Sequence, residues 1–129
     1  MRSLKLAKLA TAALIAACAG ACAIQRAELA SDARTKMVGM TKEQVLACMG
    51  PPMNKAVEGA TEVWSYNSGN DHTSVAFGRG WGVAQRRSCT VNVTMVGGRI
   101  SQMNYVGATG GLLTPGEQCA FALQNCIVQ

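Results

Sequence analysis

The sequence is poor in the residues from which metal and acid–base sites are most often built. It contains one histidine, His72, and its six cysteines include no Cys-x-x-Cys pair. A zinc site wants closely spaced thiolates or a histidine pair, so the sequence argues against a resident metal. It also predicts no cofactor and no small-molecule substrate. The glycine-rich run Gly78-Arg79-Gly80-Trp81-Gly82 lacks the strand-before, helix-after context of a phosphate cradle.

Long hydrophobic runs are also missing. The apolar run Leu9–Ala17 is well short of the about 20 apolar residues that cross a bilayer, and no later stretch approaches that length. It follows the basic residues Arg2, Lys5 and Lys8 and ends in small residues against a cysteine, Ile15-Ala16-Ala17-Cys18. This order is typical of a bacterial lipoprotein signal peptide. We therefore expect residues 1–17 to be removed and residues 18–26 to act as a tether for a domain over residues 27–129.

The lipidated cysteine has two candidates. Cys18 has a branched aliphatic residue three positions upstream, as lipoprotein processing usually favours, whereas Cys22 has alanine there. Cutting before Cys22 would instead leave an even set of four cysteines in an oxidising compartment. We expect lipidation, including palmitate, at Cys18, with Cys22 as the alternative. A plain secretory signal cut near Ala21 is the third possibility.

The net charge gives no case for nucleic acid. Removing the three basic residues of the signal peptide lowers the formal charge from +5 to +2. About 110 residues remain, enough for one small domain with a modest core. Because no later stretch is long enough to cross a bilayer, the lipid is the expected means of membrane attachment.

Two amphipathic helices are expected near the N-terminus of this domain. Apolar and small residues recur every four positions between Glu28 and Met37. Thr41 with Gln44 makes a capping-box pattern for a second helix, which Gly50-Pro51-Pro52 ends.

The rest of the chain predicts strands and a last helix. Residues 62–66 read as a strand after a polar loop around Gly59, and Cys89–Met95 alternates clearly. Gly97-Gly98 then predicts a tight turn into a strand that ends at Val106. We interpret residues 67–88 as a long, partly ordered loop, although the alternation of Thr73, Val75 and Phe77 would also fit an extra strand or an extension of the first strand. Residues 107–111 read as flexible, and Thr114-Pro115-Gly116-Glu117 predicts the start of a C-terminal helix.

Cys48, Cys89, Cys119 and Cys126 are disulfide candidates. Two disulfides are the natural use of four cysteines in a small exported domain. Cys119 and Cys126 would lie about 10 Å apart along one helix face, too far to bond to each other, so each must reach another segment. The pairing itself stays open.

The middle of the chain resembles the SmpA/OmlA family of small outer-membrane lipoproteins. The matching residues are GMTKEQVLACMGPP at 39–52, TEVWSY at 61–66 and CTVNVTMVGGRISQMNY at 89–105. The best-known member of this family is the smallest lipoprotein of the β-barrel assembly machinery. The resemblance implies an outer-membrane, lipid-anchored protein that faces the periplasm. Residues 67–88 and the cysteine-bearing tail depart from the family pattern.

Catalysis has little support in the sequence. Asp71-His72-Thr73-Ser74 has triad-like residue types, but neighbours in a loop cannot face one another as nucleophile, base and orienter. We therefore expect no enzyme. Trp64 and Tyr66 are expected to be core residues, with a partner-binding patch as the alternative. Trp81, Arg86 and Arg87 form a possible partner surface, since an exposed aromatic near cations suits an anionic lipid, a glycan or an acidic protein.

These observations predict an α+β fold in which two N-terminal helices pack on a three-stranded antiparallel sheet, with a disulfide-tied C-terminal helix. The resemblance, more than the residues themselves, implies the expected function: a non-enzymatic cell-envelope scaffold or accessory factor in outer-membrane assembly or integrity. The alternative is a periplasmic protein-binding module of inhibitor type with a soluble partner.

Overall fold

The computed structural model describes residues 20–68, 73–77, 81–85, 88–107 and 109–127. A helix over residues 20–36 opens the described chain and is followed by α2 (Lys42–Met49). The strands are β1 (Asn54–Glu58), β2 (Thr61–Ser68), β3 (Thr73–Phe77), β4 (Trp81–Gln85), β5 (Cys89–Val96) and β6 (Arg99–Val106). A short 3-10 turn, η1 (Glu117–Cys119), leads into α3 (Ala120–Ile127).

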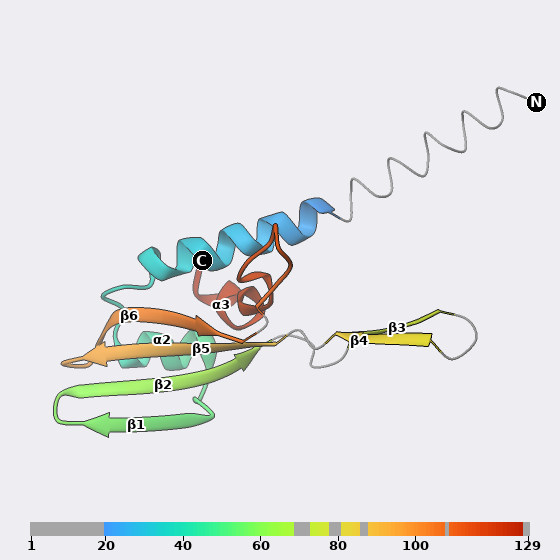
Figure 1. Ribbon diagram of the computed structural model, residues 1–129. Helices are drawn as coiled ribbons and strands as arrows, with labels where there is room; N and C mark the ends of the chain where they lie inside the picture. Colours follow the sequence, from blue (N-terminus) through green and yellow to red (C-terminus); the bar gives the residue numbers. More distant parts are fainter. Residues whose placement is uncertain (1–19, 69–72, 78–80, 86–87, 108, 128–129) are drawn as a thin grey trace, which may run out of the picture.

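Four of the strands form one antiparallel sheet in the order β1-β2-β5-β6. β3 and β4 pair only with each other and form a hairpin that extends from the end of this sheet (Figure 1). The α+β class is confirmed, but the prediction of three sheet strands is wrong because β1 is a fourth. Residues 54–58 are all exposed and therefore lack the alternation that marks a half-buried strand.

One hydrophobic core lies between the sheet and the helices. The inner face of the sheet carries Trp64 and Tyr66 of β2 opposite Val93 and Val91 of β5, and all four are buried. The expectation that both aromatic residues belong to the core is confirmed. The helices contribute the buried residues Ala30, Ala33, Val45 and Leu123, and the turn after the N-terminal helix contributes Met37.

The two ends of α2 are formed as the sequence predicts. The Thr41 side chain accepts a hydrogen bond from the Gln44 backbone, and the Gln44 side chain accepts one from the Thr41 backbone. This is the capping box that satisfies the free N–H groups of a helix start. Gly50 follows the helix with φ of 77°, a conformation that favours glycine.

Two other boundaries differ from the prediction. The N-terminal helix is already present at residue 20, so residues 20–26, expected as a tether, are helical. At the other end, the segment after Thr114 first forms the 3-10 turn η1 and becomes α-helical only at Ala120. Cys119 therefore precedes the helix that carries Cys126.

Candidate functional site

Two disulfides tie the C-terminal segment to the rest of the domain. Cys48 of α2 bonds to Cys126 of α3, and Cys89 of β5 bonds to Cys119 of η1, each with Cα atoms 5.1 Å apart. The prediction of two disulfides is confirmed, and the structure supplies the pairing that the sequence left open. Cys22 is exposed and unpaired in the part of the chain that the structure describes.

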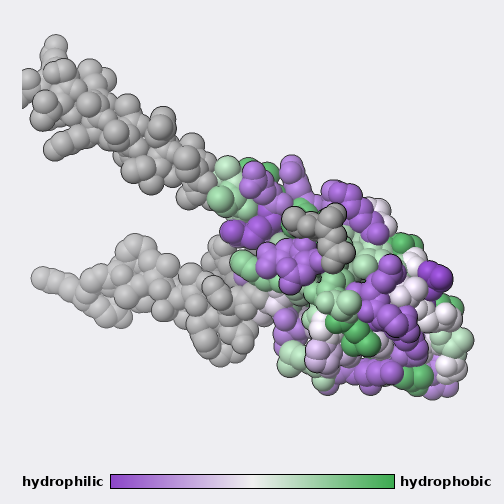
Figure 2. All heavy atoms as spheres, turned by 180° about the vertical axis from the view of Figure 1, so that it is seen from behind, coloured by the Kyte–Doolittle hydropathy of each residue, from purple (hydrophilic) through white to green (hydrophobic). Residues whose placement is uncertain are grey.

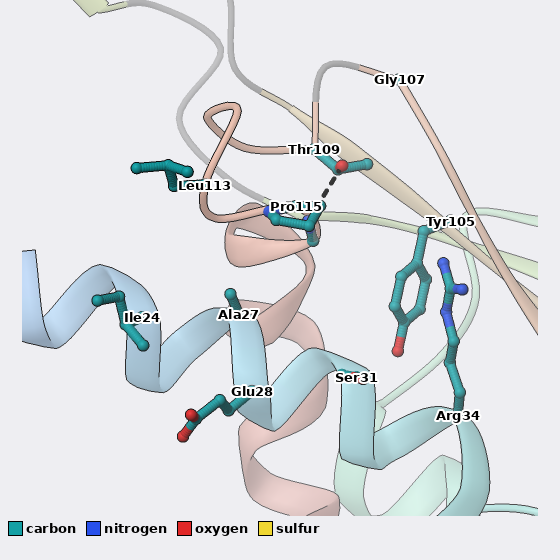
Figure 3. A pocket seen from close by; sticks show the side chains of 11 residues that line it. Ile24, Ala27, Glu28, Ser31, Arg34, Tyr105, Gly107, Thr109, Leu113 and Pro115 are labelled. Carbon is teal, nitrogen blue, oxygen red and sulfur yellow. Dashed lines mark hydrogen bonds between the residues drawn. The ribbon is translucent and has the colours of Figure 1, made fainter.

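A groove of about 500 Å³ lies between the N-terminal helix and residues 107–116 (Figure 3). Ile24, from the helix, and Leu113, from the loop, line it from opposite sides. Its other lining residues are Ala27, Glu28, Ser31, Arg34, Tyr105, Gly107, Thr109, Pro115 and Gly116.

Tyr105 closes one end of this groove. Its hydroxyl donates to the Ala30 carbonyl oxygen at 2.6 Å, and the Arg34 guanidinium lies 4.3 Å from the ring centre. Burial raises the pKa of Tyr105 to about 12, with Arg34 acting in the opposite direction. The phenol is therefore a neutral hydrogen-bond donor that fixes the helix over β6.

The loop is held at its base by buried polar contacts. The Arg26 guanidinium donates to the Glu117 carboxylate at 2.8 Å, and the Thr114 hydroxyl lies 3.0 Å from the same carboxylate. Glu117 is 6% exposed. The Gln118 backbone N–H donates to the Thr109 carbonyl oxygen at 2.7 Å, which closes the loop. These hydrogen bonds join both ends of the loop to η1 and to the N-terminal helix.

Exposed hydrophobic side chains gather near this loop. Leu112 is 100% and Leu113 88% exposed, and Ile24 and Phe121 are about half exposed. The Arg26 guanidinium lies 5.5 Å from the Phe121 ring centre, which places Phe121 beside the same helix. Figure 2 shows hydrophobic residues in green where the N-terminal helix adjoins the grey N-terminal segment.

The outer face of the sheet is polar over the middle of β2, β5 and β6, with the exposed Val96 and Val106 toward its ends. Ser65, Asn92 and Asn104 lie side by side across the three strands. The Ser65 hydroxyl donates to Asn92 Oδ1 at 2.7 Å, and Thr90 donates to Asn67 Oδ1 at 3.0 Å. Figure 1 shows this face in front, with α2 behind the sheet. Its side chains thus form an ordered array of hydrogen-bond donors and acceptors.

An ion-pair cluster joins α2 to the edge of the sheet. The Glu62 carboxylate accepts hydrogen bonds from Lys42 of α2 and from Trp64 Nε1, and it pairs with Lys55 of β1 at 3.2 Å. The Lys42 hydrogen bond is the largest of the effects that lower the pKa of Glu62 to about 2, and Lys55 and Trp64 add to it.

Stability should therefore fall in acid as Glu62 takes up a proton. Its pKa is lower in the folded chain than the ordinary value of 4.5, so its contribution is complete above pH 4.5 and is lost as the pH falls toward 2. Glu62→Gln should flatten the dependence of the melting temperature on pH in that window. Glu58→Gln, at the exposed end of β1, is the matched control. An unchanged acid profile in the Glu62 variant would contradict this assignment.

Most of the sequence-predicted partner residues lie outside the described part of the chain. Trp81 begins β4, where its backbone pairs with Phe77, but Arg86 and Arg87 fall outside the described residues. Asp71 and His72 of the triad-like run also lie outside them, whereas Thr73 and Ser74 begin β3. Within the described ranges, no three His, Cys, Asp or Glu side chains gather to hold a metal ion. No helix in those ranges is long and apolar enough to cross a membrane.

Comparisons with protein-family models, with curated proteins and with solved structures find no match for the chain. The resemblance to the SmpA/OmlA family stays an expectation from the sequence, carried by residues 39–52, 61–66 and 89–105. Within them, Gly39 donates to the Ile100 carbonyl oxygen at 2.8 Å, and Ile100 donates back to Met40 at 3.0 Å. The segment that joins the two helices thus pairs with the edge of β6.

Proposed function

We propose that the chain is an exported lipoprotein, anchored at Cys18 with Cys22 as the alternative, that acts as a non-enzymatic scaffold in the cell envelope. The observation that carries the proposal is the pairing of all four cysteines beyond residue 40 in two disulfides. Disulfides form and persist in oxidising compartments. The basic start, short apolar run and Ile15-Ala16-Ala17-Cys18 supply the export signal and the anchor.

The outer membrane is the proposed location of the lipoprotein. Ala19 follows Cys18, where an aspartate commonly retains lipoproteins at the inner membrane. The resemblance at residues 39–52, 61–66 and 89–105 supports the same location and a task in outer-membrane assembly or integrity. Fold alone does not fix that task, so the contact surfaces must identify it.

The outer face of the sheet supports a contact-making role. Its hydrogen-bonding side chains lie in rows across the strands, and hydrogen bonds within two of these rows join β2 to β5. Preorganised polar groups lose little conformational freedom when a partner binds. The same face favours the second candidate function, an inhibitor-type module that holds one soluble periplasmic protein against its sheet.

Intact mass and partner recovery test the proposal together. Protein from the membrane fraction should have the mass of a chain that starts at Cys18 and carries lipid. An N-terminus at Ala23 or an uncleaved Met1 without lipid would reject the anchor. A pull-down from solubilised envelope should recover membrane-assembly components, whereas a single soluble protein would favour the inhibitor-type module.

Asn104→Arg should reduce the recovery of either kind of partner. This change places an uncompensated charge on the outer face of the sheet, where Asn104 is exposed. Gln124→Arg on α3 adds the same charge at an exposed site on the helix side and should leave recovery unchanged. Equal recovery from both variants would show that the outer face makes no contact, and an equal loss from both would indicate a general effect of charge.

A further inference from the structure

The loop between β6 and η1 places two leucines at the corner of a tight turn. The Thr114 backbone N–H donates to the Gly111 carbonyl oxygen at 3.2 Å, so Leu112 and Leu113 are the two central residues. Such positions usually carry glycine, proline, asparagine, aspartate or serine. Here two large apolar side chains point into solvent instead.

The turn is built to hold this shape. A side chain at Gly110 would collide with the Thr114 carbonyl oxygen, so only glycine fits there. The Gly111 backbone N–H donates to the Thr114 hydroxyl at 3.2 Å, and that hydroxyl also contacts the Glu117 carboxylate. The leucines are therefore presented by a fixed structure.

The turn lies at the end of the domain that the lipid would hold. Leu113 shares the groove with Ile24, and Ile24 is only four residues from the first described residue. Those four helical residues span about 6 Å, and the step from residue 20 to Cys18 adds at most about 7 Å. Cys22 lies still nearer, so either anchor brings Ile24 and the turn close to the bilayer surface.

The turn, residues 109–116, carries no charged side chain, although Glu28 and Arg34 line the neighbouring groove. Arg26 is paired with Glu117, and Arg34 is stacked on Tyr105. The four exposed apolar side chains are Ile24, Leu112, Leu113 and Phe121. Because the turn itself has no charged residue, burial of apolar area, and not attraction to anionic lipid, should supply its affinity for the interface.

We propose that the Leu112–Leu113 turn inserts into the bilayer interface beside the N-terminal lipid. The proposal rests on the lipid anchor proposed above and assigns to the turn the task of orienting the domain. A lipid alone leaves the domain free to rotate about its attachment point. A second contact would fix how the outer face of the sheet and the β3–β4 hairpin are presented to partners.

Tryptophan fluorescence in vesicles tests the insertion. The protein is expressed from the full-length gene, so that its signal peptide is processed and its lipid attached, and is then purified. It is reconstituted in phosphatidylcholine vesicles whose acyl chains carry bromine, which quenches tryptophan fluorescence. The added tryptophan of Leu112→Trp should emit at shorter wavelength and be quenched, after subtraction of the native signal. Val57→Trp, a half-exposed site on β1, is the matched control and should be unquenched. Lack of quenching in the Leu112 variant of lipidated protein would overturn the insertion and leave the anchor standing.

A second set of variants separates the turn from the lipid. Ile24→Trp should be quenched in the native background and lose most of its quenching when Leu112→Ser and Leu113→Ser are added. Undiminished quenching would show that the lipid alone holds this end of the domain at the membrane. Quenching that needs anionic lipid and is reversed by salt would show that charge attracts the turn to the membrane. Either result overturns the proposal. If mass analysis finds no lipid on the protein, the proposed lipid anchor is rejected. Quenching of Leu112→Trp when vesicles are added to the soluble protein then still shows whether the turn inserts. In that case each of the two substitutions, Leu112→Ser and Leu113→Ser, should lower the partition of the unlipidated protein into vesicles by roughly tenfold.

Discussion

Replacing Cys89 and Cys119 together with alanine should lower the free energy of unfolding by about 2–5 kcal/mol. This disulfide joins residues 30 positions apart and links the central strand β5 to η1. Both cysteines are fully buried against the core, so the variant also loses sulfur packing. A total stability of roughly 5–15 kcal/mol is usual for a domain, so the loss should be evident. Denaturant unfolding of the oxidised proteins, followed by circular dichroism, measures it.

Two comparisons make this result specific. Cys22→Ser removes an exposed, unpaired thiol and should leave stability unchanged. Replacing Cys48 and Cys126, which are 78 residues apart, removes the larger loop constraint and should cost roughly 1 kcal/mol more in chain entropy alone. Equal stability of the native protein and the Cys89, Cys119 variant would contradict the role given to this disulfide.

Local features of the sequence predicted local features of the structure well. The capping box needs only Thr41 and Gln44, which are three residues apart, so its chemistry is complete within one turn. The alternation of Cys89–Met95 likewise reports which side chains face the core, because successive residues of a strand point to opposite faces. Gly97-Gly98 forms the tight turn between β5 and β6 with positive φ at both residues.

Features that depend on distant partners were less accessible. β1 exists because residues 54–58 pair with 61–65 of β2, and none of its side chains is buried to leave a pattern. The disulfide pairing depends on how η1 and α3 lie against β5 and α2. Cys119 lies in η1, before α3 begins, and bonds to Cys89 of β5.

The Leu112–Leu113 turn was missed for a different reason. Its glycines suggested a flexible link, whereas Thr109, Thr114 and Glu117 organise it through hydrogen bonds. A sequence signal was present: two adjacent leucines follow two glycines and precede Thr-Pro-Gly, in a stretch with no helical or strand period. Large apolar residues at positions that usually carry turn-forming residues indicate an exposed apolar contact site.

Replacing Trp64 with alanine should destabilise the domain by about 3–5 kcal/mol. Trp64 is 4% exposed on β2 and packs in the single core beneath the helices. Its Nε1 donates to the Glu62 carboxylate at 3.1 Å, so the change also removes one of the contacts that hold Glu62. Trp64→Phe keeps most of the ring volume and should cost less. Thermal and denaturant unfolding of the proteins, with both disulfides intact, checks that stability falls from the native protein to Trp64→Phe and further to Trp64→Ala.

The Trp64 variants also separate loss of fold from loss of contact. Partner recovery by Trp64→Ala should fall together with the amount of folded protein in the envelope, because the core supports the outer face of the sheet. Asn104→Arg should reduce recovery at an unchanged melting temperature, since its side chain lies outside the core. Both variants are compared at matched protein level, with Gln124→Arg as the folded control. If Trp64→Ala melted like the native protein, the central place of Trp64 in the core would be wrong, and its effect on recovery would have to come from a surface.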